Sequence, residues 1–207
     1  MANGSGDTIL MIDGGGLSGL VACATHPSPE RLRLWRPGPA DDPARERQIA
    51  EALRKRADAY GIGDVLVGEG VGPGPLRATR ALLAACEQAL RLGCGGVLWP
   101  VHHGEDTRTM CAEADRARLL GFLVGVDAGG VRARPPAIET PYLDLTLIQI
   151  ADLAVDTDVP LTDGWWVEAD AAAAEEAIRL ARARRGWPPA EAPARAVPGP
   201  EIARRTA

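Results

Sequence analysis

Short apolar runs alternate with amphipathic segments along the first hundred residues of this chain, and this alternation restricts the fold more than any other feature. Strands are predicted at 8–12, 31–35, 64–67 and 96–101, and helices at 17–24, 43–60 and 76–92. Strands that alternate with helices form a parallel sheet with helices on both faces and a ligand site at the carboxyl ends of the strands. We therefore expect an α/β fold of three layers, α/β/α, around a parallel five-stranded sheet.

The second half of the chain completes this pattern. A helix is predicted at 107–120, whereas 122–126 fits either a helix tail or a strand. A short strand is predicted at 137–140, and Thr146 with Gln149 forms a capping box that opens a helix to about residue 154. A last helix is predicted at 170–185. We expect one domain over 8–186, followed at 187–207 by a proline-rich, extended or flexible tail.

Composition narrows the range of partners. The net charge of −5 removes the general attraction that duplex-binding proteins use, so nucleic acid is not an expected partner. No apolar run reaches membrane-spanning length, and the first residues resemble no signal peptide, so we expect no membrane partner and a cytoplasmic location. The four cysteines form no Cys-x-x-Cys pair, which favours buried thiols over a zinc ribbon. A homodimer is left open.

A glycine-rich turn follows the first predicted strand. It reads Gly14, Gly15, Gly16, Leu17, Ser18 and Gly19. Glycines let the backbone approach a phosphate, and the N–H groups at the start of the next helix point toward an anion. The spacing fits neither the dinucleotide fingerprint nor a Walker loop, so a purely structural turn remains an alternative to a phosphate site.

A polar run follows the predicted strand at 96–101. His102, His103, Glu105, Asp106 and Arg108 supply a base, acids and a cation at a strand end. Three interpretations remain open: a solvated loop with Asp106 as a helix cap, a contact to substrate or phosphate, and a metal site. The histidines and acids are our catalytic candidates, and Arg108 is a substrate candidate together with Glu139, for which an arginine partner is the alternative.

The chain resembles the 7-cyano-7-deazaguanine synthase family over residues 8–166. The similarity lies in the order of elements and in the segments 14–19, 76–77, 97–101, 138–141 and 159–161. This family belongs to the PP-loop ATP pyrophosphatases of the adenine-nucleotide alpha-hydrolase-like fold. The resemblance implies a loop that binds ATP phosphates for adenylation of a carboxylate before ammonia attacks. It also implies nucleotide-binding roles for Arg45 and Arg77, which match two arginines of the family motifs.

The chain departs from the family where the chemistry is carried out. The family loop reads Ser-Gly-Gly-x-Asp-Ser. This chain has Gly14 in place of the first serine, Ser18 in place of the aspartate and Gly19 in place of the last serine. Further departures from the family residues are Glu46 for a histidine, Ala78 for an asparagine and Leu147 for a lysine, and the cysteines that hold zinc in the family are missing. Each lost donor commonly costs about two orders of magnitude in rate.

Two functions follow from this comparison. The first is a diverged PP-loop protein that binds a small-molecule nucleotide, an adenine nucleotide or related purine, and regulates or scaffolds with reduced or no synthase activity. The second is an active ATP-dependent carboxylate-amine ligase or ATP pyrophosphatase with a rebuilt site. The expected cofactor is ATP or another adenine nucleotide, Mg²⁺ is left open, and no zinc is expected. A third interpretation is a pocket closed by side chains such as that of Leu17.

Overall fold

The structure is a computed structural model that describes residues 8–39, 42–128, 136–162, 164–167 and 171–187. The strands are β1 (Ile9–Ile12), β2 (Leu32–Arg36), β3 (Val65–Val67), β4 (Gly96–Leu98) and β5 (Ala137–Glu139). The helices are α1 (Leu17–Thr25), α2 (Pro43–Tyr60), α3 (Arg77–Leu92), α4 (Thr107–Ala128), α5 (Leu147–Asp156) and α6 (Ala171–Arg184), with a short 3-10 helix η2 at Pro29–Arg31.

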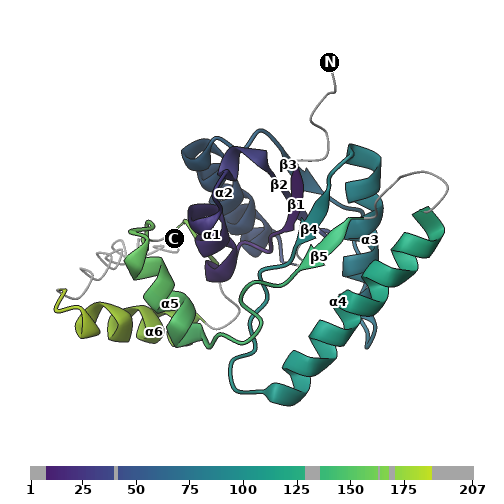
Figure 1. Cartoon of the computed structure of the whole chain (residues 1–207). Coiled ribbons are helices and arrows are strands. Elements are labelled where there is room, and N and C mark those ends of the chain that lie inside the picture. Colours follow the sequence, from purple (N-terminus) through teal and green to yellow (C-terminus); the bar gives the residue numbers. More distant parts are fainter. Residues whose placement is uncertain (1–7, 40–41, 129–135, 163, 168–170, 188–207) are drawn as a thin grey trace, which may run out of the picture.

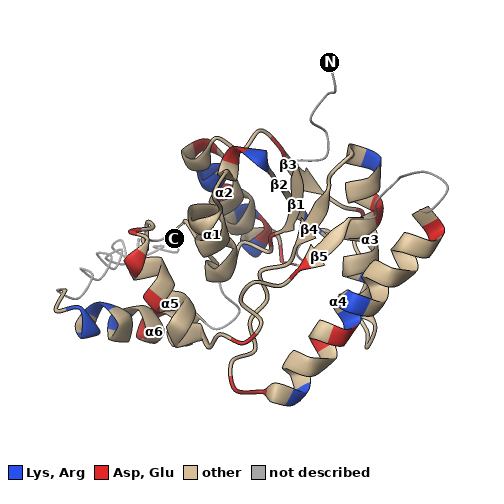
Figure 2. Cartoon of the chain, viewed as in Figure 1, with Lys and Arg blue, Asp and Glu red and all other residues tan. Residues whose placement is uncertain are grey.

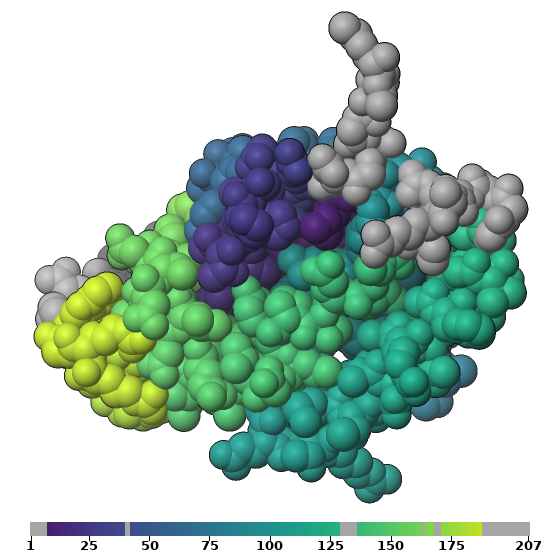
Figure 3. Space-filling model, in the orientation of Figure 1, coloured from purple at the N-terminus to yellow at the C-terminus, as the bar shows by residue number. Residues whose placement is uncertain are grey.

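The five strands form one parallel sheet in the order β3-β2-β1-β4-β5. Helices α1, α2, α5 and α6 lie on one side of the sheet, and α3 and α4 lie on the other (Figure 1). The predicted three-layer α/β/α fold is therefore confirmed. Figure 3 shows that the segment after β5, in green, lies between α1 and α4 on this side of the molecule.

Alternate side chains of the strands supply two cores, one on each face of the sheet. Met11, Leu34 and Leu98 pack with α1, α2, α5 and α6 in the larger core. Leu10, Trp35 and Val97 pack with α3 and α4 in the smaller core. Both faces of the sheet are buried at its centre, which explains why β1 and β4 have continuous apolar sequences.

Most predicted elements lie within two residues of their observed positions, and two differ more. The strand predicted at 96–101 ends at Leu98, because Pro100 has no N–H with which to continue the ladder. The segment 122–126 is helical, and α4 continues to Ala128. The predicted tail lies outside the described residues except for its first residue.

Helix α2 has the ends that its sequence predicts. The Asp42 side chain caps it by accepting a hydrogen bond from the Ala44 N–H, and Gly61 ends it with a φ of 66°. Its buried stripe contains Ile49, Leu53 and also Arg56. A charged residue on the buried stripe of a helix requires a partner inside the protein.

Helices α5 and α6 are joined by ion pairs as well as by apolar packing. Arg184 contacts Asp152 at 2.7 Å, and Arg185 contacts both Asp152 at 3.0 Å and Asp156. Figure 2 shows the acidic residues of α5 beside the basic residues of α6. These pairs are partly exposed and each contributes little, so we attribute the docking of α6 mainly to its buried alanines and Ile178.

Buried thiols make the fold sensitive to alkaline pH. Burial raises the pKa of Cys86 from 9.0 to about 11, and burial likewise raises the pKa values of Cys23, Tyr60 and Tyr142. Above pH 9 the unfolded chain loses these protons while the folded chain keeps them, so folding becomes less favourable as the pH rises.

We therefore predict that the free energy of unfolding falls steadily from pH 9 toward pH 11. Urea unfolding at several pH values measures this fall. The variant Cys86→Ala should show a shallower fall than the unaltered chain. An equal slope in both proteins would contradict the assignment to Cys86.

Candidate functional site

A crevice opens between the carboxyl ends of β1 and β4. The chain leaves β1 toward β2 on one side and returns to the other side of β1 through β4, so this is the point where the strand order reverses. Ligands of open α/β sheets bind at such points. The cavity here has a volume of about 320 Å³ and is lined by Ile12, Asp13, Gly14, Gly16, Ser18, Gly19, Arg45, Trp99, Pro100, Val101, His102 and Val167.

The glycine turn forms one wall of this crevice. Gly15 has a φ of 87°, a conformation that L side chains rarely adopt, and its N–H donates to Asp13 Oδ1 at 2.8 Å. Gly16 is the N-cap residue of α1 and has no side chain with which to cap the helix. The first turn of α1 therefore depends on groups outside the helix to satisfy its backbone donors.

Arg56 forms hydrogen bonds to this turn from the interior of the protein. Its Nη1 donates to both oxygens of Asp13, at 2.7 and 2.6 Å, and its Nη2 donates to the carbonyl oxygens of Gly15, Gly16 and Trp165. The Arg56 side chain is fully buried and that of Asp13 is 1% exposed. One guanidinium group thus joins the end of β1, the glycine turn and the segment before Val167.

This arrangement fixes the direction of the peptide groups in the turn. The C=O and the following N–H of a trans peptide point in opposite directions. Because the Gly15 carbonyl points toward Arg56, the N–H of Gly16 points away from it. The Gly15 oxygen also accepts a hydrogen bond from the Val167 N–H at 2.8 Å, which ties the segment at Val167 to the turn. Hydrogen bonds from Arg56 and Val167 thus hold the turn in this conformation.

Two of the predicted polar residues reach the crevice. Arg45, on the first turn of α2, and His102, after β4, both line it. Four of the six residues of the predicted turn also line it, whereas Gly15 lies behind the wall and Leu17 is buried in the larger core. The Leu17 side chain therefore does not close the pocket.

The other predicted residues lie elsewhere. Arg77, Glu105, Arg108 and Glu139 are exposed and do not line the crevice. Asp106 accepts hydrogen bonds from the Thr109 N–H and hydroxyl at 3.1 and 2.6 Å, and these bonds lower its pKa. Asp106 therefore has the geometry of a cap for α4, which was one of the three interpretations of this loop.

His103 faces the protein rather than the crevice wall. Its backbone N–H donates to the Leu143 carbonyl at 3.2 Å, and its imidazole Nε2 is buried without a hydrogen-bond partner in the described structure. Within the described ranges, no group of three or more His, Cys, Asp or Glu side chains is placed to hold a metal ion. The geometry thus gives no support to the metal interpretation of the loop.

The sequence analysis did not identify Asp13 and Arg56 as a buried ion pair at the site. A signal for both was present, since Arg56 falls on the apolar stripe of α2 at helical spacing from Ile49 and Leu53. A buried cation needs an acid, and Asp13 directly follows an apolar strand. Trp99 and Val167 were missed as well, because nothing local indicates that their segments meet at the glycine turn.

The chain was also compared with known proteins. Its sequence matches no protein-family model and no curated protein.

Proposed function

We propose that the crevice binds an adenine nucleotide or a related purine, with a phosphate group at the glycine turn. The observation that carries this proposal is the placement of the turn, the start of α1 and Arg45 around one cavity at the reversal of strand order. Backbone N–H groups at a helix start and an arginine are the groups that proteins use to bind phosphate.

The other walls of the cavity suit the base. Trp99, Pro100 and Val101 give it an apolar wall after β4, and Val167 adds an apolar side chain next to the turn. A nucleotide has the same division into an anionic end and a flat, largely apolar ring. The resemblance to the PP-loop ATP pyrophosphatases supports an adenine ring in particular.

We further propose that the protein regulates or scaffolds rather than turns over a substrate rapidly. Ser18 and Gly19 stand where the family loop has an acid and a hydroxyl, and the exposed Arg77 does not line the crevice. Transfer chemistry needs several positioned donors, whereas binding can use the backbone alone.

A nucleotide ligand and four free cysteines are consistent with a location in the cytoplasm. No described helix is long and apolar enough to cross a membrane.

Calorimetry with ATP and AMP tests this function, and Arg45 provides the sharpest variant. Arg45→Gln should weaken ATP binding about tenfold, which corresponds to the loss of one charged hydrogen bond of about 1.4 kcal/mol. The matched control is Arg47→Gln on the same helix, because Arg47 is exposed and lies outside the crevice. Equal losses in both variants, or no binding of either nucleotide at millimolar concentration, would contradict the proposal.

Catalysis is tested in the same samples. Release of pyrophosphate and AMP from ATP with Mg²⁺, lost in Arg45→Gln, would favour the ligase or pyrophosphatase alternative. We expect ATP to remain intact.

A further inference from the structure

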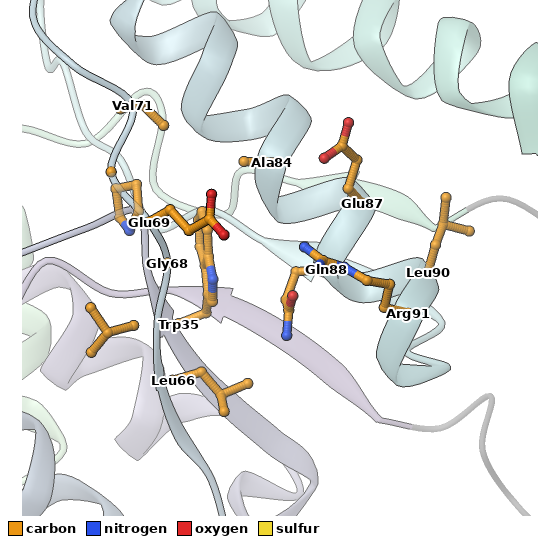
Figure 4. Close-up of a pocket in the computed structure, with 13 residues that line it drawn as sticks. Trp35, Leu66, Gly68, Glu69, Val71, Ala84, Glu87, Gln88, Leu90 and Arg91 are labelled. Carbon is orange, nitrogen blue, oxygen red and sulfur yellow. The ribbon is translucent and has the colours of Figure 1, made fainter.

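A second and larger cavity lies on the other face of the sheet, beside the edge strand β3. Its volume is about 830 Å³. One wall is the loop that follows β3, and the other is the second half of α3 (Figure 4). Helices α3 and α4 cover this face over β1, β4 and β5, whereas at β2 and β3 the smaller core reaches the cavity.

The floor of this cavity is apolar. Trp35, only 3% exposed, lies at the bottom with Leu66, and Ala84 and Leu90 line the side of α3. All four side chains belong to the smaller core or pack against it. Leu66, Ala84 and Leu90 are only partly buried, so a ligand that covers them would extend this core, and its body must be apolar.

The rim carries charges of both signs. Glu69 comes from the loop, and Glu87 and Arg91 come from α3. In Figure 4 the Glu69 carboxylate and the Arg91 guanidinium point into the cavity from its two walls. Glu87 and Arg91 are four residues apart on one helix, the usual spacing of an ion pair, yet no ion pair forms between them in the described structure.

These charges select the ligand class. Two carboxylates disfavour a polyanion such as a nucleotide, so this cavity is not a second copy of the crevice. The acids can accept hydrogen bonds from an ammonium group, and Arg91 can bind a carboxylate. We propose that this cavity binds a short free peptide of apolar residues, with its amino end at Glu69, its carboxylate at Arg91 and its side chains on Leu66 and Leu90.

The probe for this site is the free dipeptide leucyl-phenylalanine, titrated by calorimetry into the full chain. Its control is the same dipeptide with an acetylated amino end and an amidated carboxyl end. We expect saturable binding of the free dipeptide and at least about tenfold weaker binding of the blocked one, since both charged contacts are lost. Equal binding of the two, or no saturation by the free dipeptide up to about 5 mM, overturns the proposal.

Two variants locate the site. Arg91→Gln should weaken dipeptide binding about fivefold, whereas Arg118→Gln, at an exposed arginine of α4 outside the cavity, should not change it. Ala84→Phe should abolish binding by filling the cavity. Unchanged dipeptide affinity in Arg91→Gln would overturn the proposal even if Ala84→Phe failed to fold. Because this cavity and the crevice share no lining residue, ATP binding should be unaffected in Arg91→Gln.

Discussion

Replacing Arg56 by methionine is expected to lower the free energy of unfolding by about 3–5 kcal/mol, because the carboxylate of Asp13 would remain buried without its partner. The same change removes the three hydrogen bonds from Arg56 Nη2 to the carbonyl oxygens of Gly15, Gly16 and Trp165. The glycine turn should then lose its fixed orientation, and ATP binding should be lost with it. Urea unfolding and calorimetry at low temperature measure the two effects.

Two control variants separate the buried pair from a general effect on α2. Arg54→Met removes an exposed arginine two residues away and should change stability by less than about 0.5 kcal/mol. The double variant Asp13→Asn with Arg56→Met removes both charges and should be more stable than Arg56→Met alone. If the double variant were as unstable as the sum of its single changes, the ion pair would not be the cause.

A methyl group at Gly19 should be nearly as damaging. A Cβ atom there would lie 2.4 Å from Asp13 Oδ1 and 2.9 Å from Arg56 Nη1. Each atom is held by two hydrogen bonds and cannot move without breaking the pair, so Gly19→Ala should cost about 3 kcal/mol or more. Thermal unfolding measures this loss.

Gly14 offers the matched control for this substitution. A Cβ atom at Gly14 would meet nothing within 4 Å, so Gly14→Ala should change stability by less than about 0.5 kcal/mol. Similar melting temperatures for the two variants would show that the contact between α1 and the buried pair is not as close as described.

Local signals explain why the sequence predicted the layers of the fold. Asp42 and Gly61 mark the two ends of α2, and Thr146 with Gln149 marks the start of α5, because each of these residues satisfies backbone groups near itself. The central strands β1 and β4 were predicted from their apolar sequences, because both faces of the sheet are buried at its centre. Pro100 shortened β4 through its missing N–H, a local signal that the prediction did not use.

The site was harder to predict because it depends on contacts between distant segments. The glycine turn and the loop after β4 meet only because β4 pairs with β1, and no periodicity in the sequence specifies that pairing. Arg77 matches a family motif, yet it lies exposed at the start of α3, since its position depends on the path of the loop before it. Arg56 and Asp13 are 43 residues apart and required a structure to be recognised as a pair.

The homodimer left open by the sequence remains a prediction. Leu119, Phe122, Leu123 and Val126 form an exposed apolar stripe on α4, on the side opposite its buried residues. Figure 2 shows few charged residues along this half of the helix. Sedimentation of the full chain measures the oligomeric state.

The central claim is that backbone amides at the carboxyl end of β1 bind the phosphates of a nucleotide. NMR of ¹⁵N-glycine-labelled protein during an ATP titration tests it most directly. We predict saturable shifts of the Gly14, Gly16 and Gly19 amide signals and little change at Gly121 on α4. Unmoved signals at Gly14, Gly16 and Gly19 under saturating ATP would contradict the claim.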